Sequence, residues 1–465
     1  MVWAGACSLR ATVPSAPGLP LLRRIATPSK FEGEFEARLA VADPQRRLVA
    51  LVDLTDQLDL ATFMGRLPRE HLSKSQRRTA VVAALERVAA RQQARLRPAI
   101  DALVAEGSVG FVRGVAIVNR FVLEGTPAAL RALAARNEVR QVRPDWTSER
   151  AASGRTAQGV PEPLGATFPS WAPASMKADR LWSRGLDGRG VVVATIDTGA
   201  FEAHEQLAGR RAAGDAGWFD PVEGTTVGTD RHGHGTGVLS QAVGGNSGGR
   251  VVGIAPRATW AAAVGNWRNF YARSRMTLAA DWVLRTARPD VLVNAWSHDE
   301  GPCSDFDRPF IDAWKASGIF VVFPAGNGGP GPATGESPAQ LDGVLSVGAL
   351  TRDGEPDPLS SRGPSRCQSP AFPSLAAPGR DLPMASLGGP RAYATGEGTS
   401  LSAGLIGGAA ALLLQAEPET DPDTLERVLL RSSRDVGPAG RDDATGAGAV
   451  DLEAALALLR ARPTP

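Results

Sequence analysis

This 465-residue chain is poor in cysteine, in long apolar runs and in net charge, and each scarcity excludes a class of protein. Its three cysteines, Cys7, Cys303 and Cys367, are too few for a disulfide scaffold and lack the close spacing of a zinc site. No apolar run reaches the roughly 18 to 20 residues needed to cross a bilayer, so we expect no membrane span. The longest run, around Ala409 to Leu414, predicts a core helix. The first residues lack the basic region and long apolar stretch of a signal peptide. A secreted or envelope location is favoured, and a cytoplasmic one stays open.

The net charge is only +2, but it is divided unevenly. Residues 1–150 carry 23 Lys and Arg against 15 Asp and Glu, whereas the remaining residues carry 28 against 34. Such halves could attract each other, or the basic half could bind nucleic acid. Because the basic residues follow helical patterns without interleaved aromatics, we expect no nucleic-acid partner.

The composition is that of a globular protein of two or three domains, with 43% hydrophobic and 22% charged residues. Residues 1–45 are predicted to be irregular. Residues 46–151 alternate between strand-like and helical patterns in the order β-α-β-β-α-β, which predicts a small α+β domain of the split-βαβ (ferredoxin-like) type. The segments are 47–54 (strand), 74–106 (helix), 109–125 (two strands), 126–136 (helix) and 139–144 (strand).

Residues 152–177 are rich in Pro, Ser, Ala and Gly and predict a linker, and residues 178–465 form the second domain. There, short apolar runs without polar alternation predict parallel strands buried on both faces. The runs are 191–196, 251–256, 291–296, 319–326 and 344–350. With helical stretches between them, they predict a three-layer α/β sandwich with a mostly parallel sheet.

Three polar residues at the ends of these elements are candidates for chemistry. Asp197 ends a buried strand, where α/β proteins place their sites. It is equally compatible with a structural cap, and its Asp-Thr-Gly motif lacks the second copy that an aspartic protease needs. His234 follows 37 residues later within His-Gly-His-Gly-Thr-Gly, where a chance surface pair or an adventitious metal site is the alternative. Ser400 precedes an apolar helical run, so it lies at a helix N-terminus, as an ordinary N-cap also would.

The chain resembles the subtilisin-like serine proteases, or subtilases, in the order of Asp197, His234 and Ser400. It also has Ala325-Gly-Asn327 between the histidine and the serine. Five further motifs extend the resemblance from about Leu181 to Leu459. They are Gly253-Ile-Ala-Pro-Arg-Ala, Gly343-Val-Leu-Ser-Val-Gly-Ala, Ser360-Ser-Arg-Gly-Pro-Ser, Ala376-Ala-Pro-Gly and Gly446-Ala-Gly-Ala-Val-Asp. Residues 47–151 resemble, by pattern, the inhibitory propeptide of the same family.

The resemblance implies a serine endopeptidase made as a self-processing zymogen, with cleavage between Ser148 and Gly165. Ser400 would be the nucleophile, His234 the general base and Asp197 its orienting partner, while Asn327 and the Ser400 amide would form the oxyanion hole. The implied substrate-binding residues are Asn294, Ala295, Trp296, Ser297, Ala325 and Gly326. The partners would be protein or peptide substrates and the chain's own propeptide, acting on a monomer. No cofactor is required, and structural calcium is possible although no acidic loop shows its ligand spacing.

The chain departs from the family's usual motifs in three places. Gly237 stands where the second His of His-Gly-Thr-His is usual. Near the nucleophile, Glu397 replaces a Ser and Gly404-Leu405 replaces Pro-His, and in the substrate-binding strand Trp296 replaces a Ser. An inactive subtilase-fold binding module is therefore the alternative function. Cys303 and Cys367 could pair if the protein is exported, with two free thiols as the alternative.

Overall fold

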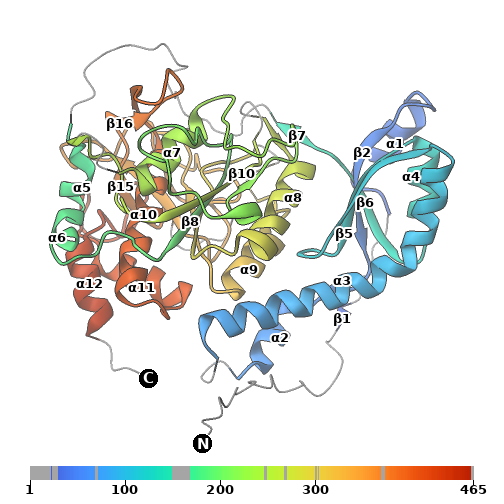
Figure 1. Cartoon of the computed structure of the whole chain (residues 1–465), viewed down its shortest axis with the longest axis horizontal. Coiled ribbons are helices and arrows are strands. Elements are labelled where there is room, and N and C mark those ends of the chain that lie inside the picture. The colour runs from blue at the N-terminus through green and yellow to red at the C-terminus, as the bar shows by residue number, and fades with distance from the viewer. Residues whose placement is uncertain are drawn as a thin grey trace, which may run out of the picture.

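The computed structural model describes residues 22–23, 30–68, 72–148, 168–245, 249–266, 270–298, 301, 303–367 and 372–461. These residues form two units, each built on its own β-sheet (Figure 1). We call residues 30–148 the N-terminal unit and residues 168–461 the C-terminal unit. Cleavage is predicted between Ser148 and Gly165. This stretch, apart from Ser148 itself, falls within residues 149–167, which lie outside the described residues.

The N-terminal unit has a four-stranded antiparallel sheet in the order β4-β5-β2-β6. Its strands are β2 (Leu48–Leu54), β4 (Val109–Val115), β5 (Arg120–Gly125) and β6 (Val139–Pro144), and its main helices are α3 (Lys74–Ala105) and α4 (Pro127–Ala134). Local sequence explains where the helices start. Ser73 and Gln76 form a reciprocal capping box at α3, and the Thr126 side chain caps α4. The predicted β-α-β-β-α-β order is present.

Short elements lie where the sequence predicted irregular chain. Helix α1 (Phe35–Val41) lies within residues 1–45, because Phe35 and Leu39 are buried against the small sheet's core. Helices α5 (Trp171–Ser175) and α6 (Ala178–Trp182) lie across the end of the predicted linker, where Ala172 and Leu181 enter the larger core. The minor elements are β1 (Leu22–Arg23), β3 (Gln57–Leu58), α2 (Leu60–Arg66) and β7 (Thr147–Ser148).

The C-terminal unit is built on a seven-stranded sheet in the order β15-β14-β13-β12-β8-β10-β9, in which each neighbouring pair is parallel. Helices cover both of its faces, so the predicted three-layer sandwich is confirmed (Figure 1). The strands are β8 (Val192–Asp197), β9 (Trp218–Phe219), β10 (Thr259–Val264), β12 (Val291–Val293), β13 (Phe320–Pro324), β14 (Ser346–Leu350) and β15 (Leu375–Pro378).

Two cores lie against the two faces of this sheet. One core contains α7 (His234–Val243), α10 (Thr399–Ala416), α11 (Pro422–Ser432) and α12 (Leu452–Arg460), and the other contains α8 (Arg273–Trp282) and α9 (Arg308–Ala316). The unit also has β11 (Tyr271–Ala272) and the hairpin β16 (Leu382–Ala385) and β17 (Tyr393–Gly396). Within the described residues, α10 is the one helix long and apolar enough to cross a membrane, and 89% of it is buried in the core.

One predicted strand is wrong. Residues 251–256 form no strand, because the backbone amides of Ile254 and Ala255 donate to the carbonyls of Gln241 and Ala242 at the end of α7. The sheet position is taken by the next segment, Thr259–Val264, whose Trp and three Ala residues give a weak strand signal. The other four predicted runs coincide with β8, β12, β13 and β14.

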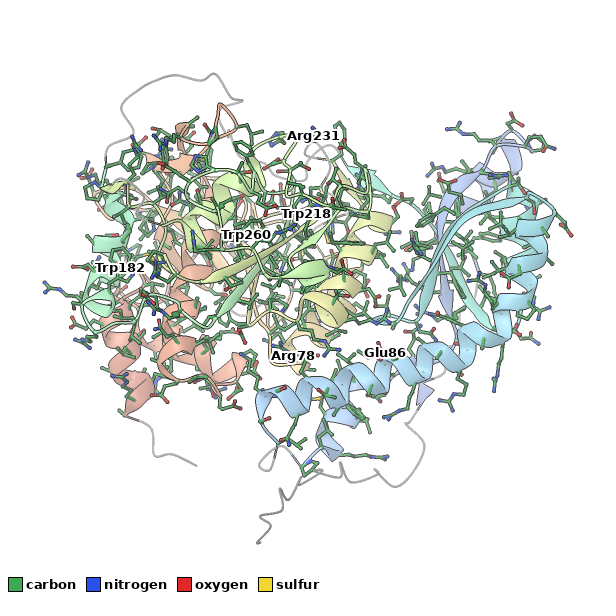
Figure 2. All side chains as sticks on the ribbon, viewed as in Figure 1. Arg78, Glu86, Trp182, Trp218, Arg231 and Trp260 are labelled. Carbon is green, nitrogen blue, oxygen red and sulfur yellow. A yellow bond between two sulfur atoms is a disulfide. The ribbon has the colours of Figure 1, made fainter. Side chains whose placement is uncertain are left out.

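The two units meet along α8 and α9. Leu51, Val115 and Val122 of the small sheet belong to the same buried cluster as Met276 and Phe310 of these helices. The long helix α3 runs beneath the C-terminal unit, and Figure 2 shows Arg78 and Glu86 on it. Arg78 donates to the carbonyls of Pro289 and Ser317, and Glu86 pairs with Arg285 at 2.8 Å.

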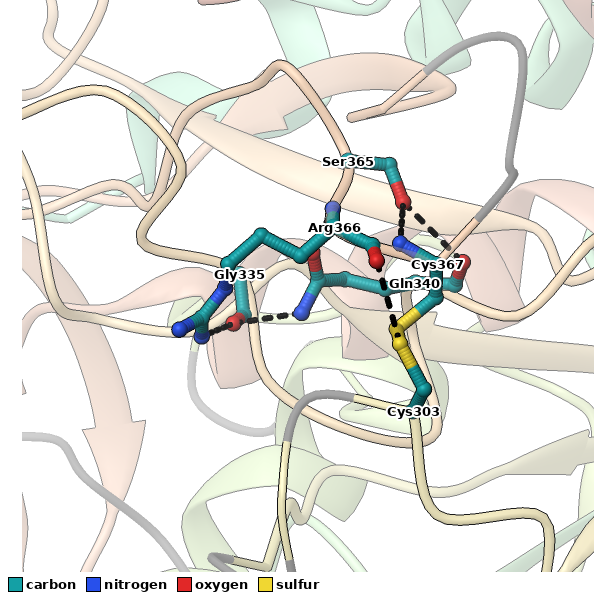
Figure 3. The surroundings of a disulfide bond; sticks show 6 residues. All are labelled: Cys303, Gly335, Gln340, Ser365, Arg366 and Cys367. Carbon is teal, nitrogen blue, oxygen red and sulfur yellow. Dashed lines mark hydrogen bonds between the residues drawn. A yellow bond between two sulfur atoms is a disulfide. The ribbon is translucent and has the colours of Figure 1, made fainter.

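Cys303 and Cys367 form a disulfide with a Cα–Cα distance of 5.2 Å (Figure 3). The structure thus selects the bridge over the free-thiol alternative. The bond joins the loop after β12 to the loop that precedes β15, and so it ties together two connecting segments of the C-terminal unit.

Candidate active site

Asp197 and His234 form a buried hydrogen-bonded pair. Asp197 is the last residue of β8 and His234 is the first of α7. Nδ1 of His234 lies 2.7 Å from Oδ1 of Asp197, and each side chain is 1% exposed. Burial alone would lower the pKa of His234, but the charge of Asp197 and the hydrogen bond to it outweigh burial, so the pKa is raised. The contact fixes the ring so that Nε2 faces away from Asp197.

Asp230 holds the start of α7 in place and is a residue that sequence reasoning missed. Its Oδ1 accepts from the backbone amides of His232 and Gly233, and its Oδ2 accepts from the amide and hydroxyl of Thr236. One carboxylate therefore satisfies donors before and after His234. Asp230 thus bonds a first-turn amide of α7 from three residues before the N-cap position, which Gly233 occupies.

Ser400 lies in the first turn of α10, and Asn327 lies beside it after β13. The amide and hydroxyl of Thr399 both donate to Oδ1 of Asn327, at 2.9 and 3.0 Å. Because a backbone amide can only donate, the accepting atom must be the side-chain oxygen. Nδ2 of Asn327 therefore remains a donor next to the start of α10, where the helix dipole also favours negative charge.

Among the described residues no hydrogen bond joins Ser400 to His234, although the helices that carry them are packed together. Ser400 is 5% exposed, and Nε2 of His234 is buried with no partner among the described residues. Helices α7 and α10 pack closely, since a Cβ at Gly404 would lie 2.7 Å from the carbonyl oxygen of Val238. Such hydrogen bonds are often open in ligand-free sites and close around a substrate.

The residues expected to bind substrate follow two neighbouring strands, β12 and β13. Ala325 and Gly326 lie between β13 and Asn327. In the segment that follows β12, the backbone amide of Asn294 donates to the carbonyl of Val322 at 3.0 Å, and the Ser297 hydroxyl donates to Glu336. The indole of Trp296 is 1% exposed and packs against Tyr271 and Phe323, so it faces the core. The Asn294 amide is also fully buried, and neither of its side-chain polar atoms has a partner in the described part of the chain.

Glu336 is a second residue that sequence reasoning missed. Its carboxylate accepts a hydrogen bond from the Ser297 hydroxyl, 39 residues away in sequence. Local sequence does not predict such a contact, because it depends on how two loops lie relative to each other.

The described residues contain no group of three or more His, Cys, Asp or Glu side chains that could hold a metal ion.

Comparisons with known proteins identify the family of this chain. A family model described as "Subtilase family" matches residues 188–448, which is more than half of the chain.

The chain belongs to the subtilase family.

Among its relatives, Bacillopeptidase F of Bacillus subtilis is 27% identical over 385 residues, covering 76% of this chain and 26% of the relative. Serine protease AprX of the same organism is 31% identical over 303 residues, covering 58% of this chain and 66% of the relative. Subtilisin DY of Bacillus licheniformis is 29% identical over 283 residues, covering 60% of this chain and 96% of the relative. The chain thus spans less than two thirds of the first two relatives' length.

The departures from the usual subtilase motifs have physical explanations. A Cβ at Gly237 would lie 2.7 Å from Sδ of Met384, so this methionine fills the space that a side chain would need. Gly404 gives α10 its close contact with α7, described above. Glu397 is held by Arg380 at 2.8 Å, and Arg380 is fixed in turn by two hydrogen bonds to Asp357. The substituted residues are therefore integrated into the packing around the site.

Proposed function

We propose that this subtilase is a serine endopeptidase that hydrolyses peptide bonds with Asp197, His234, Ser400 and Asn327. The observation that carries the proposal is the buried Asp197–His234 pair at the start of α7, a helix packed closely against α10. The first turn of α10 carries Ser400, beside the Asn327 amide. Serine needs an adjacent base to become a nucleophile, and this arrangement supplies one. The chain's membership of the subtilase family supports this proposal.

In this mechanism the Ser400 hydroxyl attacks the peptide carbonyl while Nε2 of His234 accepts its proton. The protonated imidazole is stabilised by Asp197, which already raises its pKa. Hydrogen bonds from Nδ2 of Asn327 and from the Ser400 amide stabilise the negative charge on the tetrahedral oxygen. His234 then donates its proton to the leaving amine, and water repeats the sequence to release the acyl group. No metal ion or organic cofactor takes part in these steps.

We also propose that the N-terminal unit is an inhibitory propeptide. Three contacts support this role. Oδ1 of Asp281 on α8 accepts from the amides of Ala116 and Ile117, at 2.9 and 3.0 Å. Asp145 accepts from the amide and hydroxyl of Ser274, at the start of the same helix. Beyond Asp145, β7 pairs antiparallel with β11, which leads the chain onto the C-terminal unit as an added strand.

A fluorophosphonate probe tests the catalytic proposal directly. The wild-type protein should be labelled at Ser400, whereas Ser400→Ala should not be labelled. Failure to label the processed wild-type protein would favour the binding-module alternative.

A separately expressed fragment of residues 1–151 tests the propeptide proposal. Added to the processed enzyme, it should inhibit at sub-micromolar concentration. Absence of inhibition at tens of micromolar would contradict the proposed role.

A further inference from the structure

A half-buried carboxylate lies between the two strand ends that flank the candidate site. Glu336 accepts a hydrogen bond from the Ser297 hydroxyl, on the segment that follows β12. On the other side, a Cβ added to Gly326 would lie 3.9 Å from Oε2 of Glu336. The carboxylate therefore faces both segments that line the approach to Asn327.

This carboxylate is close to the reacting groups. The Gly326 amide donates to the hydroxyl of Thr399 at 3.2 Å, and Thr399 immediately precedes Ser400. Gly326 also immediately precedes Asn327 and has a φ of +105°, a conformation that a larger residue would adopt only with strain. A Cβ at this position would lie 2.9 Å from Oγ of Ser361, so only glycine fits here between the Ser361 hydroxyl and the Glu336 carboxylate.

The loop that carries Glu336 is held on both sides. Its preceding residue, Gly335, accepts hydrogen bonds through its carbonyl from Gln340 and, at 2.8 Å, from Arg366 (Figure 3). Its following residue, Ser337, accepts from the His298 amide at 3.1 Å. Arg366 adjoins Cys367, so the disulfide to Cys303 anchors this support. A charged group fixed in this way needs little reorganisation to bind a ligand.

We infer that Glu336 lies at the base of the pocket for the substrate residue that precedes the cleaved bond, and that it selects arginine or lysine there. The inference rests on the proposed peptidase function. When a peptide carbonyl lies between Ser400 and Asn327, the adjoining side chain projects past Gly326 into the space that Glu336 faces. A carboxylate in that position forms a charge-assisted hydrogen bond with a guanidinium or ammonium group.

Matched peptides test this specificity in the enzyme purified after self-processing. The pair differs only in carrying arginine or its neutral analogue citrulline before the cleaved bond. The wild type should cleave the arginine peptide with a kcat/KM roughly 10- to 100-fold higher, the range expected for a hydrogen bond between charged groups. In Glu336→Gln the ratio should fall to within about threefold of one. The control Glu355→Gln removes the same charge at an exposed position and should leave the ratio unchanged.

A second measurement does not depend on how the variant folds. Benzamidine, a small cation, should competitively inhibit the wild-type enzyme, whereas neutral benzamide at the same concentration should not. A labelled, active enzyme that prefers citrulline or apolar residues and ignores benzamidine would overturn the specificity and leave the peptidase function intact. An enzyme that is neither labelled nor active would overturn both.

The same pocket predicts where the chain cuts itself. Arg150 and Arg155 are the only basic residues between Ser148 and Gly165. The processed protein should therefore begin at Ala151 or Thr156, as N-terminal sequencing would report. A processed form beginning after any other residue of this stretch in a pure preparation would contradict the inference.

Discussion

The two β-sheets of this chain differ in what covers them. In β8 of the larger sheet, Val193 and Ala194 point to opposite faces, and helices of the same unit cover both. In β2 of the smaller sheet, Val52 packs into the N-terminal unit's own core, whereas Leu51 packs against α8 and α9 of the other unit. Helices α8 and α9 thus cover one face of the larger sheet and also contact one face of the smaller sheet.

This difference separates a self-contained unit from a dependent one. Every candidate catalytic group lies in the C-terminal unit, whose sheet needs no cover from outside. The N-terminal unit has one sheet face whose buried cluster is shared with the other unit, and an uncovered apolar face weakens a small domain. We therefore expect changes at the catalytic groups to leave the docking of the two units intact, and changes at the interface to leave the chemistry intact.

The largest expected effect comes from Ser400→Ala. Peptidase activity should fall by roughly 10⁶-fold, because no other group can supply the nucleophile. The chain should stay full length, since self-processing would use the same serine, and its two units should remain docked. Activity assays and intact mass measure these outcomes. A processed form in a pure Ser400→Ala preparation would show that another protease, or another residue, makes the cut.

Next in size is Asn327→Ala, which removes one of the two proposed oxyanion donors. We expect kcat to fall roughly 10²- to 10³-fold with little change in KM, because the donor acts mainly on the transition state. Steady-state kinetics of the processed enzyme measure the two constants separately. A loss below tenfold would mean that another donor fills the role.

A smaller effect is expected at the interface. Asp281→Ala removes the acceptor for the Ala116 and Ile117 amides and leaves two donors without their partner. Inhibition by the 1–151 fragment should weaken roughly 10- to 100-fold, while kcat on a short peptide stays the same.

The matched control for Asp281→Ala is Asp353→Ala, which removes an exposed carboxylate. It should change neither quantity. Equal losses of inhibition in the two variants would assign the effect to overall charge, and a fall in kcat for Asp281→Ala would contradict the separation of docking from chemistry.

The smallest expected effect is a shift in pH dependence. His234 must be neutral to accept a proton, and its pKa is raised above the ordinary value of 6.5 despite burial. The acid limb of kcat/KM should therefore have its midpoint above pH 6.5. The stabilising charge pair with Asp197 is complete below pH 6.5 and is lost as the pH rises through the raised pKa. A midpoint below 6.5 in the processed enzyme would show that Asp197 does not outweigh burial.

The sequence predicted most of the fold because its signals are local. Ser73 and Thr126 mark helix starts, and the runs at β8 and β13 carry unbroken apolar residues. The prediction was wrong where tertiary contacts override local signals. Residues 251–256 look like a strand but bind the end of α7, while the alanine-rich β10 joins the sheet because Thr259–Val264 pairs in register with Val192–Asp197.

The same division applies to the site. The sequence predicted Asp197, His234, Ser400 and Asn327 because they stand in recognisable motifs at the ends of elements. Asp230 and Glu336 were missed, since each acts through contacts that no motif records. The direction of the Trp296 side chain was also beyond the sequence, because it depends on the aromatic neighbours Tyr271 and Phe323.

The open face of the small sheet has a consequence during synthesis of the chain. Strand β5 ends at Gly125, and α8 begins at Arg273, so at 5 to 20 residues per second the face waits roughly 7 to 30 s for its cover. The face is not wholly apolar: Asp53 bonds to Arg120 at 2.7 Å and to two further arginines, Arg140 and Arg143. These charges interrupt the apolar surface as gatekeeper residues do, and they disfavour association between nascent chains. In ribosome-bound chains halted before Arg273, the N-terminal unit should be cut readily by limited proteolysis. In chains halted after α9, it should be resistant.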